Sequence, residues 1–357
     1  MPGKSKRRTP VKVSDLRMDE LLRPIGDIKS LHVILTLRCN YRCAFCFQPN
    51  FRDDLPEHIW REKLTPLYPG LENVVLHGGE PTLVPAFREF CELINGRNDR
   101  VRFSLFTNGY KFDGYWAALM AGRGRFVNFS LNACTPETYA RVNRRDHYHA
   151  VLDNVRRFRA LAGDVAVDFS FVITAENLHE VPGFLRLAAD HGVDRVRYFF
   201  DLDLLPPDRD EIRRTLDATA EIRRELPDLE VWGLEVFEGR VFGTPVASRH
   251  LESHGCRRTF DNLYVGVNGD ASFCNFLGWS PIGNLNDSSL EEIWNSPGAL
   301  AQRRAQDRGE WEFCTNAYCG PTEEHPVIGA RRDTAARTAD DRVLVPVEAL
   351  LSRPDDR

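Results

Sequence analysis

The chain has 357 residues, enough for one large domain together with a smaller one. Hydrophobic residues make up 42% and charged residues 28%, a globular composition that argues against a disordered chain. The net charge is -5 and no apolar run is long enough to cross a bilayer, so neither nucleic acid nor a membrane is an expected partner. Nine cysteines without a signal peptide favour metal-binding or catalytic thiols in a reducing compartment, and we expect a cytoplasmic protein.

From residue 31 to about 200, short β-branched or aromatic runs alternate with longer amphipathic runs. The expected strands are Leu31–Leu37, Asn73–Leu76, Val101–Phe106, Phe126–Leu131, Val165–Ile173 and Arg195–Phe200. The expected helices are Glu57–Tyr68, Pro85–Asn95, Tyr115–Ala121, Pro136–Leu161 with a break, and Leu178–His191. The alternation predicts an α/β fold, a partial (βα)6 TIM-like barrel with a parallel sheet and right-handed crossovers.

Three cysteines, Cys39, Cys43 and Cys46 in the stretch CNYRCAFC, follow the first expected strand. Thiolates are the usual protein ligands of iron–sulfur clusters. Three thiolates leave one iron of a cubane cluster without a protein ligand, and an open metal position is where chemistry takes place. The alternatives are a structural zinc with His32 or His77 as fourth ligand, or unligated thiols.

Polar segments also follow the later strands, namely GGEP at Gly78–Pro81, TNG at Thr107–Gly109, Ser130-Leu131-Asn132, and Thr174 with Asn177. The C-terminal ends of barrel strands share one face, which carries the reactive groups. The two glycines of GGEP would let the backbone approach a ligand closely. Each segment also has an ordinary interpretation, because GGEP can be a turn and Asn177 can cap the next helix.

The C-terminal part has a different character. A charged helix, Asp208–Glu225, leads to a glycine-rich connection around Gly233–Gly243. Asn268-Gly269 predicts a β-hairpin with a type I′ turn, which brings Cys256 near Cys274. Four cysteines in this part suffice for one cluster ligated wholly by protein, or for tetrahedral zinc; they are Cys256, Cys274, Cys314 and Cys319.

Together these motifs resemble the radical S-adenosylmethionine (radical SAM) superfamily, whose members carry a CxxxCx(aromatic)C loop. The segment from Cys256 to Cys319, with its hairpin glycine and its GNL sequence, resembles the SPASM or twitch extension. The resemblance implies a SAM-binding 4Fe–4S cluster on the three-cysteine loop and an auxiliary 4Fe–4S cluster on the four later cysteines. A full SPASM domain has seven cysteines and usually two auxiliary clusters, so this chain departs from that pattern.

The resemblance also assigns contacts to SAM and a domain organisation. It implies that the methionyl amino group binds at GGEP and that the ribose and carboxylate meet polar groups further along, a set comprising Gly78, Gly79, Glu80, Asn108, Ser130, Arg144 and Thr174. Arg141 and Arg145 are alternatives to Arg144. The expected divisions are an N-terminal extension 1–30, the barrel 31–230, the auxiliary domain 231–325 and a tail 326–357.

The two remaining cysteines lie within the barrel part. Cys91 falls on an amphipathic helix and is expected in the core. Cys134 follows Ser130-Leu131-Asn132 on the expected active face, where it is a candidate donor of a hydrogen atom to a substrate radical. Buried packing is the alternative for Cys134.

The expected activity is reductive cleavage of SAM to a 5′-deoxyadenosyl radical, followed by hydrogen abstraction that leads to oxidation or epimerisation. An external one-electron donor such as flavodoxin or ferredoxin is implied. About thirty residues precede the first strand, too few for a leader-peptide recognition domain. This favours a small substrate of the sugar, aminocyclitol or nucleoside type over a ribosomally made peptide. A non-catalytic iron–sulfur or zinc protein is the alternative from another class.

Overall fold

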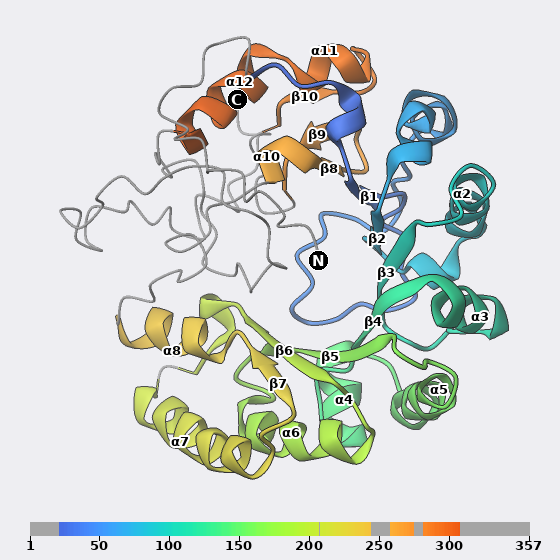
Figure 1. The fold of residues 1–357 in the computed structure, drawn as a ribbon. Coiled ribbons are helices and arrows are strands. Elements are labelled where there is room, and N and C mark those ends of the chain that lie inside the picture. The colour runs from blue at the N-terminus through green and yellow to red at the C-terminus, as the bar shows by residue number, and fades with distance from the viewer. Residues whose placement is uncertain (1–20, 207, 244–257, 275–280, 308–357) are drawn as a thin grey trace, which may run out of the picture. The chain divides into compact units, whose positions relative to one another are not determined.

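The computed structural model describes residues 21–206, 208–243, 258–274 and 281–307 (Figure 1). Cys256, Cys314, Cys319 and the expected tail 326–357 lie outside these residues. By their contacts, the described residues divide into two compact units. The larger unit lies within Lys29–Val246 and Val265–Gly269, and the smaller within Met1–Ile28, Ala247–Tyr264 and Asp270–Arg357. In the described part of the chain, no helix is long and apolar enough to span a membrane.

The larger unit is built on a curved sheet in which each strand pairs in parallel with the next one along the chain. The strands are β1 (Ser30–Ile34), β2 (Asn73–His77), β3 (Arg102–Thr107), β4 (Gly124–Ser130), β5 (Ala166–Ile173), β6 (Arg195–Phe200) and β7 (Glu230–Trp232). All six expected strands are confirmed. The sequence analysis missed β7, because three residues are too few to show an alternating pattern.

Helices connect the strands and lie along the outer side of the sheet (Figure 1). They are α2 (Pro85–Asn95), α3 (Gly114–Arg123), α4 (Pro136–Asn143), α5 (Tyr148–Arg159), α6 (Val181–Asp190), α7 (Arg209–Glu225) and α8 (Leu234–Phe242). The expected break in Pro136–Leu161 occurs at Arg144, whose φ of 53° ends α4 in the left-handed region.

One expected helix has a different helical type, and one expected connection is itself a helix. The expected helix Glu57–Tyr68 is a π-helical turn, Ile59–Lys63, followed by a 3₁₀ segment, Thr65–Gly70. Pro66 and Pro69 lack an N–H and cannot continue an α-helical ladder. The expected glycine-rich connection is instead the helix α8, which lies between two glycines with positive φ, Gly233 and Gly243.

The two faces of the sheet differ in chemistry. Phe129, Phe169 and Phe171 contact phenylalanines of α5 and α6, so their face packs against the helices. Side chains alternate along a strand, so their neighbours lie on the opposite face. We call this the inner face; it carries His32, His77, Phe106, Phe126, Asn128, Ser130, Asp168, Ser170 and Arg197.

Among its described residues, the smaller unit has short strands in the order β10–β9–β8 together with α-helices. The strands are β8 (Asn262–Val265), β9 (Asp270–Ser272) and β10 (Gly283–Asn284), and the helices are α10 (Arg258–Asp261), α11 (Leu290–Trp294) and α12 (Pro297–Asp307). A fully buried arginine, Arg303, joins these segments by donating to the carbonyls of Thr259 (2.7 Å) and Leu21 (3.2 Å).

The expected hairpin is present but its turn is not type I′. The Gly269 amide donates to the Gly266 carbonyl at 2.9 Å, so Val267 and Asn268 are the central residues. Of these turn residues, Gly269 alone has a positive φ, 86°, whereas a type I′ turn requires positive φ at both central positions. The connection is longer than the two-residue turn that was predicted, and the left-handed glycine closes it.

Candidate functional site

The segment after β1 that carries Cys39, Cys43 and Cys46, which we call the cysteine loop, is closed at its base by two backbone hydrogen bonds. The Leu37 amide donates to the Asp53 carbonyl, and the Leu55 amide to the Leu35 carbonyl, both at 2.8 Å. Within the loop, the Cys46 amide donates to the Cys43 carbonyl at 3.1 Å. The three thiols are half-buried. The loop therefore presents all its thiols from one closed turn at the C-terminal end of the first strand.

Two thiols of this loop, those of Cys39 and Cys43, have raised pKa values. Burial raises the pKa of Cys39 to about 11, and burial together with the neighbouring thiols raises the pKa of Cys43 to about 12. Metal ligands must be deprotonated, so loading this loop at neutral pH releases protons.

The donor set fits an iron–sulfur cluster better than a zinc ion. Among the described residues, no group of three or more His, Cys, Asp or Glu side chains is arranged around a single ion position. His32 and His77, the suggested fourth ligands for zinc, contact each other edge to face with ring centroids 6.0 Å apart. In a cubane each thiolate binds a different iron, so the three thiols on this loop supply three of the four ligands that it needs.

The glycines after β2 are required for packing against the cysteine loop. A Cβ on Gly79 would lie 2.2 Å from the Arg38 carbonyl oxygen, and one on Gly78, whose φ is 129°, would lie 2.8 Å from the Thr36 oxygen. The Gly79 amide donates to the Thr36 carbonyl at 2.9 Å, and the Glu80 amide donates to the Arg38 carbonyl at 2.8 Å. The glycines therefore let the GGEP backbone pack closely against the backbone of the cysteine loop.

Glu80 joins GGEP to the TNG segment. The carboxylate is 1% exposed. Its Oε1 accepts from the Thr82 amide (3.0 Å) and from the hydroxyls of Thr82 (2.6 Å) and Thr107 (2.7 Å), and its Oε2 accepts from the Asn108 amide (2.6 Å). Burial raises the pKa of Glu80, and these four hydrogen bonds oppose the rise. Oε2 carries a single protein bond and retains a lone pair for a further donor.

Asn108 connects the TNG segment back to the cysteine loop. The side-chain nitrogen of Asn108, Nδ2, donates to Asn40 Oδ1 at 2.8 Å and lies 4.0 Å from Cys39 Sγ. Its oxygen accepts from the Tyr110 amide at 3.1 Å. The cysteine loop, GGEP and TNG are therefore joined in one hydrogen-bonded edge.

A second network of buried asparagines joins the loop after β4 to the cysteine loop. Asn143 accepts from Cys43 Sγ (3.5 Å) and from Asn132 Nδ2 (3.1 Å), and it donates to the Leu131 carbonyl (2.9 Å). Asn132 has a φ of 65° and accepts from the Val172 amide at 2.9 Å. The sequence analysis named Asn132 only as part of a segment and missed Asn143.

We expect Asn143→Ala to destabilise the larger unit and weaken retention of iron. The variant leaves the Leu131 carbonyl and the Asn132 amide unpaired in a buried site, at a cost of about 1–3 kcal/mol for each group. Denaturant unfolding and iron analysis of anaerobic protein measure the two effects. Asn286→Ala, at an exposed position of the smaller unit, is the control. Equal stability and iron content in both variants would contradict this role for Asn143.

The other residues predicted to contact SAM lie after the fourth and fifth strands and at the end of α4. Ser130, at the end of β4, accepts from the Ser170 hydroxyl at 3.2 Å. Thr174 is buried and donates from its amide and hydroxyl to Asn177 Oδ1. Asn177 therefore does not cap the following helix with its side chain. Arg144 is exposed and ends α4.

The two isolated cysteines are packed in different ways. Cys91 is fully buried in α2, as expected for a core residue. The Cys134 thiol donates to the Glu180 carbonyl at 3.4 Å, and the Cys134 amide donates to the Glu180 carboxylate at 2.5 Å. Burial raises the pKa of the Cys134 thiol. These contacts direct Cys134 toward the segment that precedes α6.

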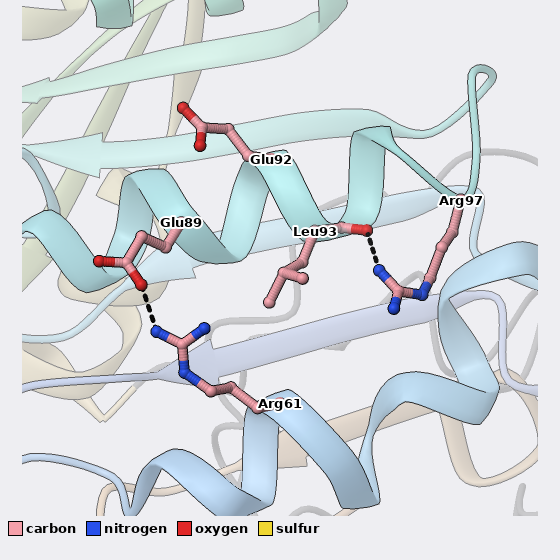
Figure 2. A pocket seen from close by; sticks show the side chains of 5 residues that line it. All are labelled: Arg61, Glu89, Glu92, Leu93 and Arg97. Carbon is pink, nitrogen blue, oxygen red and sulfur yellow. Dashed lines mark hydrogen bonds and ion pairs between the residues drawn. The ribbon is translucent and has the colours of Figure 1, made fainter.

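One surface pocket of about 330 Å³ lies on the outer side of α2, lined by Arg61, Glu89, Glu92, Leu93 and Arg97. Figure 2 shows two contacts in its lining: Arg61 pairs with Glu89, and Arg97 donates to the Leu93 carbonyl at 3.0 Å. Arg61 also pairs with Glu57 at 3.0 Å. We assign this pocket no function.

Comparison with known proteins agrees with this geometry. Residues 33–188 match the model of the radical SAM superfamily, and residues 256–320 match the SPASM iron–sulfur cluster-binding domain. A probable GTP 3′,8-cyclase of Saccharolobus islandicus (strain M.14.25 / Kamchatka #1) is 29% identical over 186 residues, 50% of this chain and 58% of the relative. The GTP 3′,8-cyclase of Streptomyces coelicolor is 30% identical over 172 residues, 46% and 50% of the two chains. The chain thus spans about half the length of the curated relatives it matches.

Solved structures share the fold at low sequence identity. Streptococcus suis SuiB bound to its precursor peptide SuiA has a TM-score of 0.58 at 15% identity, over 78% of this chain and 67% of that one. Native anSMEcpe with bound AdoMet has a TM-score of 0.56 at 16% identity, over 76% and 82%. The two family matches imply a SAM-binding 4Fe–4S cluster and an auxiliary cluster. The chain is a member of the radical SAM superfamily that carries a SPASM domain.

Proposed function

We propose that this chain cleaves SAM reductively and oxidises a small hydroxylated substrate held against the inner face of the sheet. The observation that carries the proposal is the single hydrogen-bonded edge formed by the cysteine loop, GGEP and TNG. The edge places three metal-binding thiols beside a buried carboxylate, at the ends of parallel strands where barrel enzymes act.

Within this edge, the proposed roles follow from charge and hydrogen-bonding capacity. Glu80 Oε2 takes the methionyl amino group, whose positive charge holds the buried carboxylate ionised. Asn108 and Ser130 offer polar contacts to the ribose and carboxylate, and Arg144 offers a positive charge to the carboxylate. Gly78 and Gly79 keep GGEP in register with the cysteine loop. Thr174 fixes the loop after β5 through Asn177.

When bound, the reduced cluster supplies one electron that splits SAM into methionine and a 5′-deoxyadenosyl radical, and the auxiliary cluster supplies an acceptor for an electron from the substrate. Cys39, Cys43 and Cys46 would hold the former, and Cys256, Cys274, Cys314 and Cys319 are proposed to hold the latter. In the proposed oxidation, a carbinol would lose one hydrogen atom to the radical, one electron to the auxiliary cluster and one proton to solvent, and would become a carbonyl.

The inner face supports a polar substrate. The Ser170 hydroxyl bonds to Asn128 (2.8 Å) and Ser130 (3.2 Å). Two buried atoms beside it, Asn128 Nδ2 and Asp168 Oδ1, have no hydrogen-bond partner among the described residues. A donor and an acceptor on neighbouring strands at register partners suit a hydroxyl group, which both accepts and donates. Sugar, aminocyclitol and nucleoside substrates all supply such hydroxyls.

The test is incubation of reduced, iron-reconstituted protein with SAM and candidate substrates under anaerobic conditions. We expect 5′-deoxyadenosine to form, and a substrate that is used to raise its rate and to be recovered with two fewer hydrogens. A short precursor peptide that raised the rate while polyols did not would replace the small substrate with a peptide. Zinc without sulfide in the purified protein, with no 5′-deoxyadenosine, would indicate a non-catalytic metal protein.

Heavy water separates oxidation from epimerisation. We expect a substrate oxidised by this chain to gain no deuterium at carbon in D₂O, and Cys134→Ala to keep product formation within about twofold because the Cys134 thiol is bonded to the Glu180 carbonyl. Mass spectrometry of the recovered product measures both. Deuterium at an inverted carbon, lost in Cys134→Ala, would make Cys134 the hydrogen donor of an epimerase.

A further inference from the structure

Five exposed cations lie either in the loop that carries the three cysteines or in the segments after β3 and α4 that contact it. We call them the basic rim: Arg42, Arg52, Lys111, Arg144 and Arg145. All five are exposed, and in the described part of the chain none of them takes part in an ion pair. Because the whole chain carries a net charge of -5, this concentration of positive charge is not a consequence of overall composition.

Contacts place the basic rim against the loop itself. Arg42 donates to the carbonyls of Cys39 and Tyr41, both at 2.6 Å, and its guanidinium lies 3.9 Å from the Phe51 ring centroid. Arg145 donates to the Asn40 carbonyl at 2.7 Å. The guanidinium groups of Arg42 and Arg145 therefore lie beside the backbone of the cysteine loop.

Lys111, another residue of the basic rim, is linked to the cysteine loop through a series of aromatic contacts. Lys111 lies 5.0 Å from the Tyr110 ring centroid, and Tyr110 stacks on His147 with centroids 3.6 Å apart. His147 contacts the Tyr41 hydroxyl at 3.2 Å. Burial lowers the pKa of His147, and the charges of Arg145 and Lys111 lower it further, against an opposing effect of Asp146. Rim and loop therefore share one surface.

Three acids lie near the rim and do not neutralise it. Asp54 is paired with Arg38, and Asp53 accepts from the Asn50 side chain at 2.7 Å. Asp146 is exposed between Arg145 and His147. Without Arg144, whose charge is assigned to the SAM carboxylate, four rim cations against Asp53 and Asp146 still leave an excess of positive charge at this surface.

An exposed aromatic ring completes the surface. Phe47 follows Cys46 directly and is 82% exposed, the largest exposure among the large hydrophobic side chains of the described residues. Interfaces between proteins commonly combine an apolar centre with a charged rim, and complementary charge raises the rate of encounter. A small anion would not use Phe47, whereas a protein partner would cover it.

We propose that the basic rim with Phe47 is the docking surface for the electron donor, and that this donor is an acidic one-electron carrier protein. The inference rests on the proposed function, because a cluster on this loop must receive its electron from outside the chain. It names the place where that electron enters: the surface beside Cys39 and Cys46.

The test compares a protein reductant with a small one. The variant Arg52→Glu/Lys111→Glu avoids Arg42 and Arg145, which bond to the loop backbone, and Arg144, which is assigned to SAM. We expect its rate of oxidising an acidic flavodoxin hydroquinone to fall about tenfold at low salt and to lose most of its dependence on ionic strength. Iron content and dithionite-driven formation of 5′-deoxyadenosine are expected to stay at the wild-type level.

A matched control changes the same amount of charge elsewhere. Arg100→Glu/Arg224→Glu alters two exposed arginines outside the rim, and its rate with flavodoxin hydroquinone is expected to match wild type. Phe47→Ser is expected to slow the flavodoxin reaction without changing its salt dependence. An unchanged rate in the rim variant, or an equal loss with dithionite, would overturn the docking surface. Wild-type protein that makes no 5′-deoxyadenosine with dithionite would instead overturn the proposed function on which the inference rests.

Discussion

Cys43→Ala is expected to reduce formation of 5′-deoxyadenosine to the level of an enzyme-free control. Cys43 lies at the centre of the loop, and its sulfur contacts Asn143 at 3.5 Å. Two remaining thiolates cannot hold a cubane that already lacks one protein ligand. The measurement is product analysis after anaerobic reduction with dithionite in the presence of SAM.

The matched control for this loss is Cys91→Ala. Cys91 is fully buried in α2 and does not belong to the cysteine loop. Its removal leaves a small cavity and lowers stability modestly, but iron content and SAM cleavage are expected to remain. Wild-type levels of 5′-deoxyadenosine from Cys43→Ala would show that the chemistry takes place elsewhere.

Glu80→Ala is expected to cause both a large loss of stability and a loss of SAM binding. The variant removes the acceptor of four hydrogen bonds from Thr82, Thr107 and Asn108 at a site that is 1% exposed. Each buried donor left without an acceptor costs about 1–3 kcal/mol. Denaturant unfolding measures the stability, and equilibrium binding of SAM to the anaerobic protein measures the affinity.

Two further variants separate the structural role of Glu80 from its role in binding. Glu80→Gln keeps the shape and one acceptor oxygen, so it is expected to recover much of the stability while SAM binding stays weak, because the negative charge is lost. Glu92→Gln removes an exposed acid of α2 and is the neutral control. SAM affinity of Glu80→Gln equal to wild type would contradict the assignment of the amino group to this carboxylate.

Much of the barrel could be predicted from the sequence because its strands are continuous β-branched and aromatic runs. Runs such as Val165–Ile173 read as buried strands, and the polar segments that follow them lie, as predicted, at one edge of the sheet. The expected helix Glu57–Tyr68 is helical, but it has π and 3₁₀ geometry because Pro66 and Pro69 cannot donate to an α-helical ladder. β7 has three residues, too few to show the alternation of a strand. The type of the hairpin turn depends on which backbone amide closes it, and here that is the Gly269 amide.

The hydrogen-bond networks of the site could not be predicted, because they join residues that are far apart in the sequence. Asn143 reaches Cys43 across 100 positions of the chain, and the Glu80 carboxylate meets Thr107 across 27. The packing of Gly78 and Gly79 against the backbone before Cys39 is a contact of this kind, whereas their assignment to SAM stays a prediction. The auxiliary ligand set remains a prediction, because Cys256, Cys314 and Cys319 lie outside the described residues.

The most direct test of the account is whether SAM contacts the iron held by Cys39, Cys43 and Cys46. In a Cys274→Ala variant, which we expect to keep about four of about eight irons, electron paramagnetic resonance reports on this cluster alone. The account predicts that adding SAM to the reduced variant changes the spectrum. A spectrum identical with and without SAM, in protein that retains its iron, would contradict the claim that this cluster has an open position for SAM.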